Sequence, residues 1–175
     1  GFEQNIIDIR RLLDQTIQYT RNVTFELSPP VLYELGLIAA IEWLSEQSPE
    51  KYGFKVNLTT EGNRINLPDE IEIILFKAIR ELLTNSAKHG HASLVNIHFK
   101  WHEHKIEVNI DDNGTGFDSK ESVSIKNTGF GLFSIRERIR YLGGYFDIRS
   151  EKGEGTEVKI IIPEKTLYKG ENYED

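Results

Sequence analysis

Two runs of alternating apolar and polar residues most constrain the fold of this chain. The first run has its apolar side chains at Val95, Ile97, Phe99 and Trp101, and the second at Ile106, Val108 and Ile110. Apolar residues at every second position share one face of a β-strand. Because only a short polar stretch separates the runs, they predict a hairpin with one buried face. Other elements must cover that face.

The flanking sequence predicts helices and further strands that can supply this cover. The predicted helices are residues 37–51, 68–89 and 132–142, and the predicted strands are residues 54–59, 95–101, 106–110, 145–149 and 157–162. Pro68 and Gly90 bracket the second of these helices, with proline first and glycine last. The order predicts an α+β fold, in which helices cover one face of a mixed, mostly antiparallel sheet.

A long helix is predicted ahead of this domain, over residues 2–27. Its seam follows a heptad repeat, with Phe2, Ile6, Ile9, Leu13, Thr16, Thr20, Val23 and Leu27 at alternating steps of four and three. Pro29 and Pro30 end the helix, because proline cannot continue its hydrogen-bond ladder. Either the helix packs on its own domain, or it is one strand of a helical bundle shared between two chains.

Composition excludes several classes of protein. The net charge of -7 argues against a general nucleic-acid binder, and the absence of cysteine excludes disulfides and thiol catalysis. No apolar run approaches the roughly 20 residues that span a bilayer. The sequence starts with Gly1 inside a predicted helix, so we expect a piece of a longer protein whose membrane segments, if it has them, lie elsewhere.

The first candidate site element lies on the helix predicted over residues 68–89. Glu81 and Asn85 are four residues apart and therefore project from the same face, which Lys77 and Lys88 extend. Carboxylate, amide and ammonium groups together can hold Mg²⁺ and a phosphate. The alternative is an ordinary solvated face of a helix.

Three glycine-rich segments are the other candidates, and each taken alone could be a plain turn. Residues 112–116 (Asp-Asn-Gly-Thr-Gly) follow a strand, where glycine permits close approach of the backbone to a ligand. Residues 129–132 (Gly-Phe-Gly-Leu) lead into a helix, whose free N–H groups favour phosphate. Residues 153–156 (Gly-Glu-Gly-Thr) precede the last strand.

The order and spacing of these four elements resemble those of the Bergerat-fold ATPases, the superfamily of DNA gyrase, Hsp90-type chaperones, histidine kinases and MutL-type repair proteins. The histidine-kinase branch is the most similar. Its N box matches residues 81–89, and its glycine boxes match residues 112–116, 129–132 and 153–156. The resemblance covers roughly residues 54–163 and implies a two-layer α/β sandwich that binds ATP.

The resemblance also implies roles for single residues. Asn85 would ligate Mg²⁺, Glu81 would orient or deprotonate a group near the γ-phosphate, and Asp112 would bind the adenine amino group. Thr156 would support Asp112 through water, and residues 117–128 would form the lid over ATP. The remaining implied contacts are Gly114 and Gly116 at the base, Gly129, Gly131 and Leu132 where the lid closes, and Lys88 and His89 at the phosphates.

Residues 20–40 resemble the end of the dimerisation helix of nitrate-sensor-like and DesK-like kinases, through Leu27-Ser28-Pro29-Pro30 and Leu35-Gly36-Leu37. The implied domains are a bundle helix over residues 1–30, an ATP-binding catalytic domain over residues 31–165 and an acidic tail over residues 166–175. None of the five histidines lies in an acceptor motif on a bundle helix; they are His89, His91, His98, His102 and His104.

The resemblance therefore implies a cytoplasmic catalytic domain that transfers the γ-phosphate of ATP to a histidine outside this sequence. A response regulator would then receive the phosphoryl group, and the full-length protein would be a homodimer. An anti-sigma-type serine kinase would lack the helix over residues 2–27, and a gyrase- or chaperone-type ATPase would carry a further transducer domain. A degenerate binding module that has lost ATP is the alternative from another class, against which the four intact boxes argue.

Overall fold

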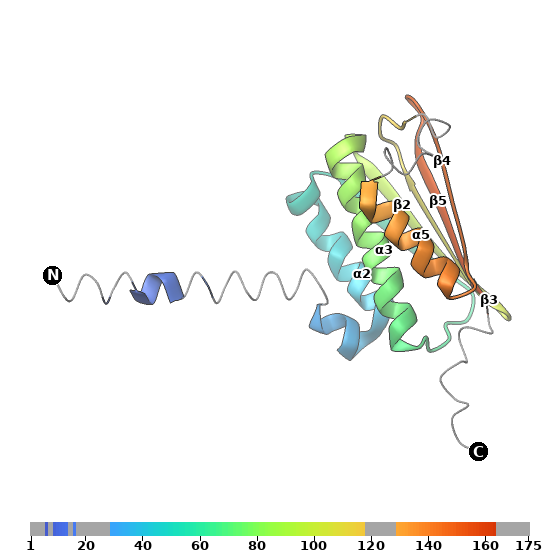
Figure 1. The fold of residues 1–175 in the computed structure, drawn as a ribbon, viewed down its shortest axis with the longest axis horizontal. Helices are drawn as coiled ribbons and strands as arrows, with labels where there is room; N and C mark the ends of the chain where they lie inside the picture. The colour runs from blue at the N-terminus through green and yellow to red at the C-terminus, as the bar shows by residue number, and fades with distance from the viewer. Residues whose placement is uncertain (1–5, 7–8, 14–15, 17–28, 118–128, 164–175) are drawn as a thin grey trace, which may run out of the picture.

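The computed structural model describes residues 6, 9–13, 16, 29–117 and 129–163, and within them five strands form a single mixed sheet (Figure 1). The strand order is β1-β2-β3-β5-β4; β1 runs parallel to β2, and every other neighbouring pair is antiparallel. The elements are α2 (Pro30–Tyr52), β1 (Lys55–Glu61), α3 (Asp69–Asn85), the π-helical turn η1 (Ser86–Gly90), β2 (Leu94–His102), β3 (Lys105–Asp112), α5 (Gly129–Tyr141), β4 (Tyr145–Glu151) and β5 (Gly155–Pro163). The predicted fold class is confirmed.

The predicted hairpin is the centre of the sheet. His102 pairs with Lys105 across its two-residue turn, and β3 continues the pairing on its other side with β5. Since the apolar positions of neighbouring strands align in this register, they form one continuous buried face. Its members are Val95, Ile97, Phe99, Trp101, Ile106, Val108, Ile110, Phe146, Val158, Ile160 and Ile162.

Helices α2, α3 and α5 cover this face, with α3 in contact with both of the others (Figure 1). Helix α3 begins after Pro68 and has Asp69, Glu70 and Glu72 in its first turn, where negative charge favours a helix N-terminus. Its apolar side chains are buried on more than one side, as the central position requires; they are Ile71, Leu75, Phe76, Ala78, Ile79, Leu82 and Leu83.

Helix α2 begins earlier than the sequence predicted and contains a kink. The predicted start is Leu37, but the chain is already helical from Pro30, and Gly36 interrupts the helix with φ 82° and ψ 178°. At the kink, Leu37 N donates a hydrogen bond of 3.2 Å to Glu72 Oε1 of α3. Burial raises the pKa of Glu72, against the effect of this hydrogen bond. The kink is therefore tied directly to the first turn of α3.

The described N-terminal residues, 6, 9–13 and 16, are helical, as predicted. Among them Ile6, Ile9, Leu12 and Leu13 are 51–57% exposed. The rest of the predicted helix over residues 2–27, the predicted lid beyond residue 117 and the acidic tail lie outside the described residues. Among the described residues, no helical segment combines the length and the hydrophobicity that crossing a membrane requires.

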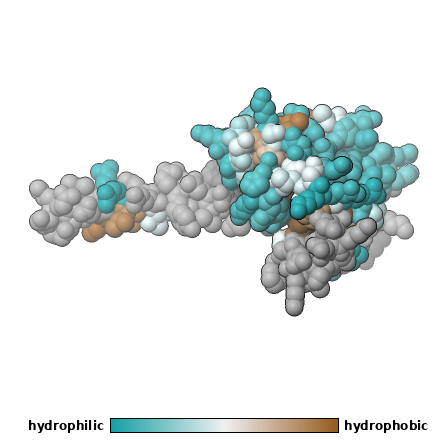
Figure 2. Space-filling model, turned by 90° about the horizontal axis from the view of Figure 1, so that it is seen from above, coloured by the Kyte–Doolittle hydropathy of each residue, from teal (hydrophilic) through white to brown (hydrophobic). Residues whose placement is uncertain are grey.

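The other face of the sheet carries polar side chains, and Glu107 lies at the centre of a charged cluster on it. Lys159 Nζ lies 2.8 Å from Glu107 Oε1, Lys105 Nζ lies 3.5 Å from Oε2, and Asn109 Nδ2 donates to Oε1 at 3.0 Å. These hydrogen bonds, above all that from Lys159, lower the pKa of Glu107 to about 2. Hydrophilic residues also predominate over the described domain in the view of Figure 2.

Replacing this carboxylate should change how stability depends on pH. A carboxyl whose pKa falls on folding stabilises the folded state above its unfolded pKa of about 4.5, and this contribution is lost as the pH falls towards 2. Glu107→Gln should therefore cost roughly 1–3 kcal/mol at pH 7, and the difference from wild type should shrink below pH 4.5. Urea unfolding at pH 7, 4 and 3 measures both the loss of stability at pH 7 and its decrease at lower pH.

Glu103→Gln is the control, because Glu103 lies at the hairpin turn and its side chain is 88% exposed. It should change the free energy of unfolding by less than about 0.5 kcal/mol at each pH. A difference between wild type and Glu107→Gln that stayed constant down to pH 3 would contradict the assigned role of Glu107.

Candidate functional site

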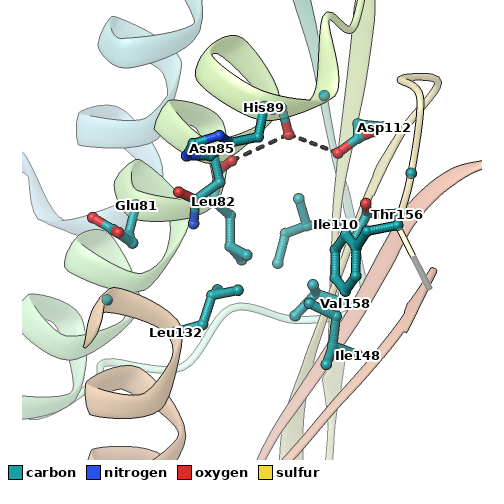
Figure 3. A pocket seen from close by; sticks show the side chains of 15 residues that line it. Glu81, Leu82, Asn85, His89, Ile110, Asp112, Leu132, Ile148, Thr156 and Val158 are labelled. Carbon is teal, nitrogen blue, oxygen red and sulfur yellow. Dashed lines mark hydrogen bonds between the residues drawn. The ribbon is translucent and has the colours of Figure 1, made fainter. Parts of the chain in front are cut away.

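A pocket of about 450 Å³ lies between α3 and η1 on one side and the ends of β3, β5 and β4 on the other, with the start of α5 closing it (Figure 3). Both polar and apolar side chains line it. They are Glu81, Leu82, Asn85, Ser86, His89, Gly90, Ile110, Asp112, Gly116, Phe117, Gly131, Leu132, Ile148, Thr156 and Val158. The volume is typical of pockets that bind small molecules and cofactors.

Asp112 is the acidic group at the strand end of this pocket. It continues the alternation of β3 two positions beyond Ile110, and the register sets it opposite Thr156 of β5. Its carboxylate accepts two hydrogen bonds, from Gly114 N to Oδ1 at 2.9 Å and from Ser86 Oγ to Oδ2 at 2.7 Å. The carboxylate is thus held by donors at both oxygens, beside the apolar side chains that line the pocket.

Ser86 is not among the site residues predicted from the sequence. The signal that could have revealed it is its position four residues after Leu82, on the buried face of the helix. Ser86 is only 6% exposed, and buried hydroxyl groups need hydrogen-bond partners. A serine in that stripe therefore indicates a buried acceptor nearby, which is the carboxylate of Asp112.

Close backbone contacts fix the turn that follows Asp112. Thr115 N donates to Gly90 O at 2.6 Å, and Thr115 Oγ1 donates to His89 O at 3.3 Å. At Gly114, an added Cβ would overlap Gly90 O. Glycine is therefore required for this turn to lie against η1, although Gly114 does not line the pocket.

Glu81 and Asn85 line the opposite side of the pocket from β5 (Figure 3). They lie one turn apart on α3, as predicted, and both are half-buried. Gly131 of α5 packs on Glu81 so closely that a Cβ there would collide with the carboxylate. The glycine of the second glycine box thus leaves room for the Glu81 carboxylate in the position that it occupies beside α5.

Most of the predicted site residues come together in this one pocket. Glu81, Asn85, His89, Asp112, Gly116, Gly131, Leu132 and Thr156 line it. Gly129 is the first residue of α5, and the exposed Lys88 is not among the lining residues. Lys88 is therefore a weaker candidate for a phosphate contact than His89.

Ser150, in β4, is a second buried hydroxyl that the sequence analysis did not identify. Its Oγ donates to Gly155 O at 2.7 Å, accepts from Phe117 N at 2.9 Å and lies 3.2 Å from Thr156 Oγ1. Ser150 thereby connects Phe117, the first residue of the predicted lid, to the first residues of β5.

The lining residues suit a nucleotide. The side chains of Leu82, Ile110, Leu132, Ile148 and Val158 give the pocket an apolar part that can hold a planar base. In that part, the carboxylate of Asp112 can accept a hydrogen bond from an amino group. Asn85 offers a single amide oxygen to a cation, which suits Mg²⁺ because this ion takes most of its ligands from phosphates and water.

The family model that describes histidine kinase-, DNA gyrase B-, and HSP90-like ATPases matches residues 70–166 of the chain. This match covers more than half of the sequence and includes the residues that line the pocket. The chain belongs to this ATPase family.

The chain is also similar to curated proteins that are named as histidine kinases. The chain is 32% identical to the signal transduction histidine-protein kinase/phosphatase DegS of Brevibacillus brevis over 160 residues, which is 91% of this chain and 41% of that protein. It is 32% identical to the oxygen sensor histidine kinase NreB of Staphylococcus carnosus (strain TM300), over 89% of this chain and 44% of that protein. The sensor histidine kinase ComP of Bacillus subtilis (strain 168) is 31% identical, over 91% and 21%.

The chain thus spans less than half the length of these relatives.

Solved structures of histidine kinases support the fold. The histidine kinase domain of the blue-light activated histidine kinase from Erythrobacter litoralis EL346 superimposes with a TM-score of 0.58 at 20% identity, over 75% of this chain and 66% of that one. The mycobacterial sensor histidine kinase MprB gives a TM-score of 0.53 at 20% identity, over 70% and 91%.

The turn before β5 and the first residue of that strand offer a matched pair of substitutions that tests the close packing at Asp112. Gly153 and Gly155 both have positive φ, 91° and 83°, so alanine at either costs about 1–2 kcal/mol in backbone strain. An added Cβ at Gly155 would also collide with Asp112 O, whereas nothing lies within 4 Å at Gly153. Gly155→Ala should therefore destabilise by roughly 1–3 kcal/mol more than Gly153→Ala in urea unfolding. Equal losses would show that β3 and this turn are not in the contact described.

Proposed function

We propose that this chain is the ATP-binding catalytic domain of a two-component sensor histidine kinase. The observation that carries the proposal is the carboxylate of Asp112, held by two donors beside apolar side chains and separated by the pocket from Glu81 and Asn85. Such a pocket accommodates an amino-bearing base at one end and the phosphates at the other. The similarity to DegS, NreB and ComP supports the histidine-kinase branch.

In this proposal, the residues on one side of the pocket bind the base, and those on the other side bind the metal ion and act at the phosphates. Asp112 accepts a hydrogen bond from the adenine amino group, and Thr156, opposite it, supports the same contact through water. Asn85 would hold Mg²⁺, which when bound neutralises charge on the phosphates. Glu81, on the same helix face, orients or deprotonates the attacking group near the γ-phosphate. Catalysis by these residues is mostly positioning and electrostatic stabilisation.

The rest of the reaction involves groups outside this sequence. The γ-phosphate would pass to a histidine on a dimerisation bundle, and from there to an aspartate of a response regulator receiver domain. The exposed Ile6, Ile9 and Leu13 follow the heptad seam, which supports assignment of the N-terminal helix to that bundle. The full-length protein would be a homodimer that acts in the cytoplasm and does not bind nucleic acid.

Replacing the proposed base acceptor should abolish nucleotide binding. Titration calorimetry with a non-hydrolysable ATP analogue and Mg²⁺ should give a dissociation constant in the micromolar to millimolar range for wild type. Asp112→Ala should show no measurable binding, because a buried amino group would lose its acceptor. The matched control is Asp111→Ala, since Asp111 lies next in sequence but is exposed and bonded to Asn96. Equal weakening by the two variants would argue against base recognition by Asp112.

Replacing Glu81 should separate binding from transfer. Glu81→Gln keeps the shape of the side chain, so the affinity for the ATP analogue should stay within about twofold of wild type. Phosphoryl transfer to an added histidine-bearing helical bundle should fall by roughly 10²- to 10⁴-fold, the range for loss of a catalytic acid–base group. Labelled ATP measures this rate.

Glu70→Gln is the control for that experiment, because Glu70 is exposed in the first turn of the same helix. It should transfer phosphate at the wild-type rate. Transfer by Glu81→Gln at the rate of Glu70→Gln would exclude the proposed role. A wild-type chain that binds ATP but transfers nothing would favour a degenerate binding module.

A further inference from the structure

Ser86 is a buried polar residue of the pocket that is not among the proposed contacts to the nucleotide. It is the first residue of η1, directly after Asn85, and it is 6% exposed. Buried hydroxyl groups need hydrogen-bond partners, and the partners of Ser86 Oγ are Leu82 O and Asp112 Oδ2.

The Ser86 hydroxyl has two acceptors within reach and a single hydrogen to give. Leu82 O, one helical turn earlier, lies 3.1 Å from Oγ, whereas Asp112 Oδ2 lies 2.7 Å away, and both contacts are drawn as dashed lines in Figure 3. The contact with Leu82 is the local back-bond that serines commonly make in helices. A bond to a carboxylate is stronger than one to a carbonyl, and the shorter distance agrees. The hydrogen therefore points to Asp112.

This bond completes the support of the Asp112 carboxylate. Gly114 N binds Oδ1 and comes from the turn after β3, whereas Ser86 binds Oδ2 and comes from the helical layer. Two donors from opposite sides prevent the carboxylate from rotating about its last bond. Each oxygen keeps a further lone pair. The group is therefore a fixed acceptor, ready for a donor that enters the pocket.

We infer that Ser86 is a positioning residue that strengthens recognition of the 6-amino group of the base by holding Asp112. The inference rests on the proposed nucleotide site and goes beyond it, because it assigns selectivity to a side chain that need not touch the base. Without the hydroxyl, Oδ2 loses its donor and the carboxylate loses one of its two fixed points. Replacement of Ser86 should therefore lower the affinity for ligands that donate a hydrogen bond to Asp112 and leave the affinity for other ligands unchanged.

A pair of ligands isolates this effect. ADP carries the 6-amino group, and purine riboside 5′-diphosphate is the same molecule without it. For Ser86→Ala, calorimetry in the presence of Mg²⁺ should show roughly tenfold weaker binding of ADP, the effect of about one hydrogen bond. Purine riboside 5′-diphosphate should bind wild type and variant within about twofold of each other.

Thr84→Ala is the matched control. Thr84 Oγ1 makes the same kind of back-bond, to Arg80 O at 2.8 Å, on the same helix, but it does not line the pocket. This variant should leave both affinities unchanged. Ser86→Cys serves if the alanine variant does not fold, because a thiol has nearly the same shape and is a weak donor. It should show the same selective loss for ADP.

The outcomes separate this inference from the proposed function. Equal losses for the two ligands in Ser86→Ala and Ser86→Cys would overturn the inference, because they would assign Ser86 to the shape of the pocket alone. Unchanged binding of both ligands by the two variants would overturn it as well. A wild-type chain that binds neither ligand would overturn the proposed function, and with it the basis of the inference.

Discussion

The close approach of the end of β3 to the end of α3 is the constraint on which the pocket depends. Asp112 must pair with β5 and at the same moment lie within hydrogen-bond distance of η1. Backbone atoms crowd this position from two sides, since Gly114 faces Gly90 O and Gly155 faces Asp112 O. Glycine at position 114 allows the turn after β3 to lie against η1, and glycine at position 155 allows the start of β5 to lie close beside the end of β3.

Features that are determined by residues close together in the sequence could be predicted. The hairpin of β2 and β3 was predicted because each of its residues faces either water or the core, which imposes a period of two on hydrophobicity. Helix α3 and its continuation η1 were predicted as one helix because Pro68 and Gly90 bracket the two and because apolar side chains recur at helical spacing. The N box and the glycine boxes could be placed relative to these elements, so most of the candidate site followed.

Features that depend on tertiary contacts could not be predicted. Strands β1 and β2 pair in parallel, and nothing in their sequences indicates that these two segments are neighbours. The helical segment that follows Gly36 is stabilised at its first residue, Leu37, by Glu72, a residue of another helix. The change from α- to π-helical geometry at Ser86 produces no change in the pattern of hydrophobic residues along the sequence. The roles of Ser86 and Ser150 depend on the acceptors that the fold brings close to their hydroxyl groups. Single polar residues on a buried face are the only sequence sign of such bonds.

The strand order has a consequence for how the pocket arises as the chain folds. Hairpins β2–β3 and β4–β5 join neighbours in sequence, and each can close over a short loop at small entropic cost. The pairing of β3 with β5 joins residues as distant as Asp112 and Thr156, and neither hairpin holds both. Both residues line the pocket, so it exists only once the two hairpins have docked. Binding of a nucleotide would therefore report the docking of these two hairpins.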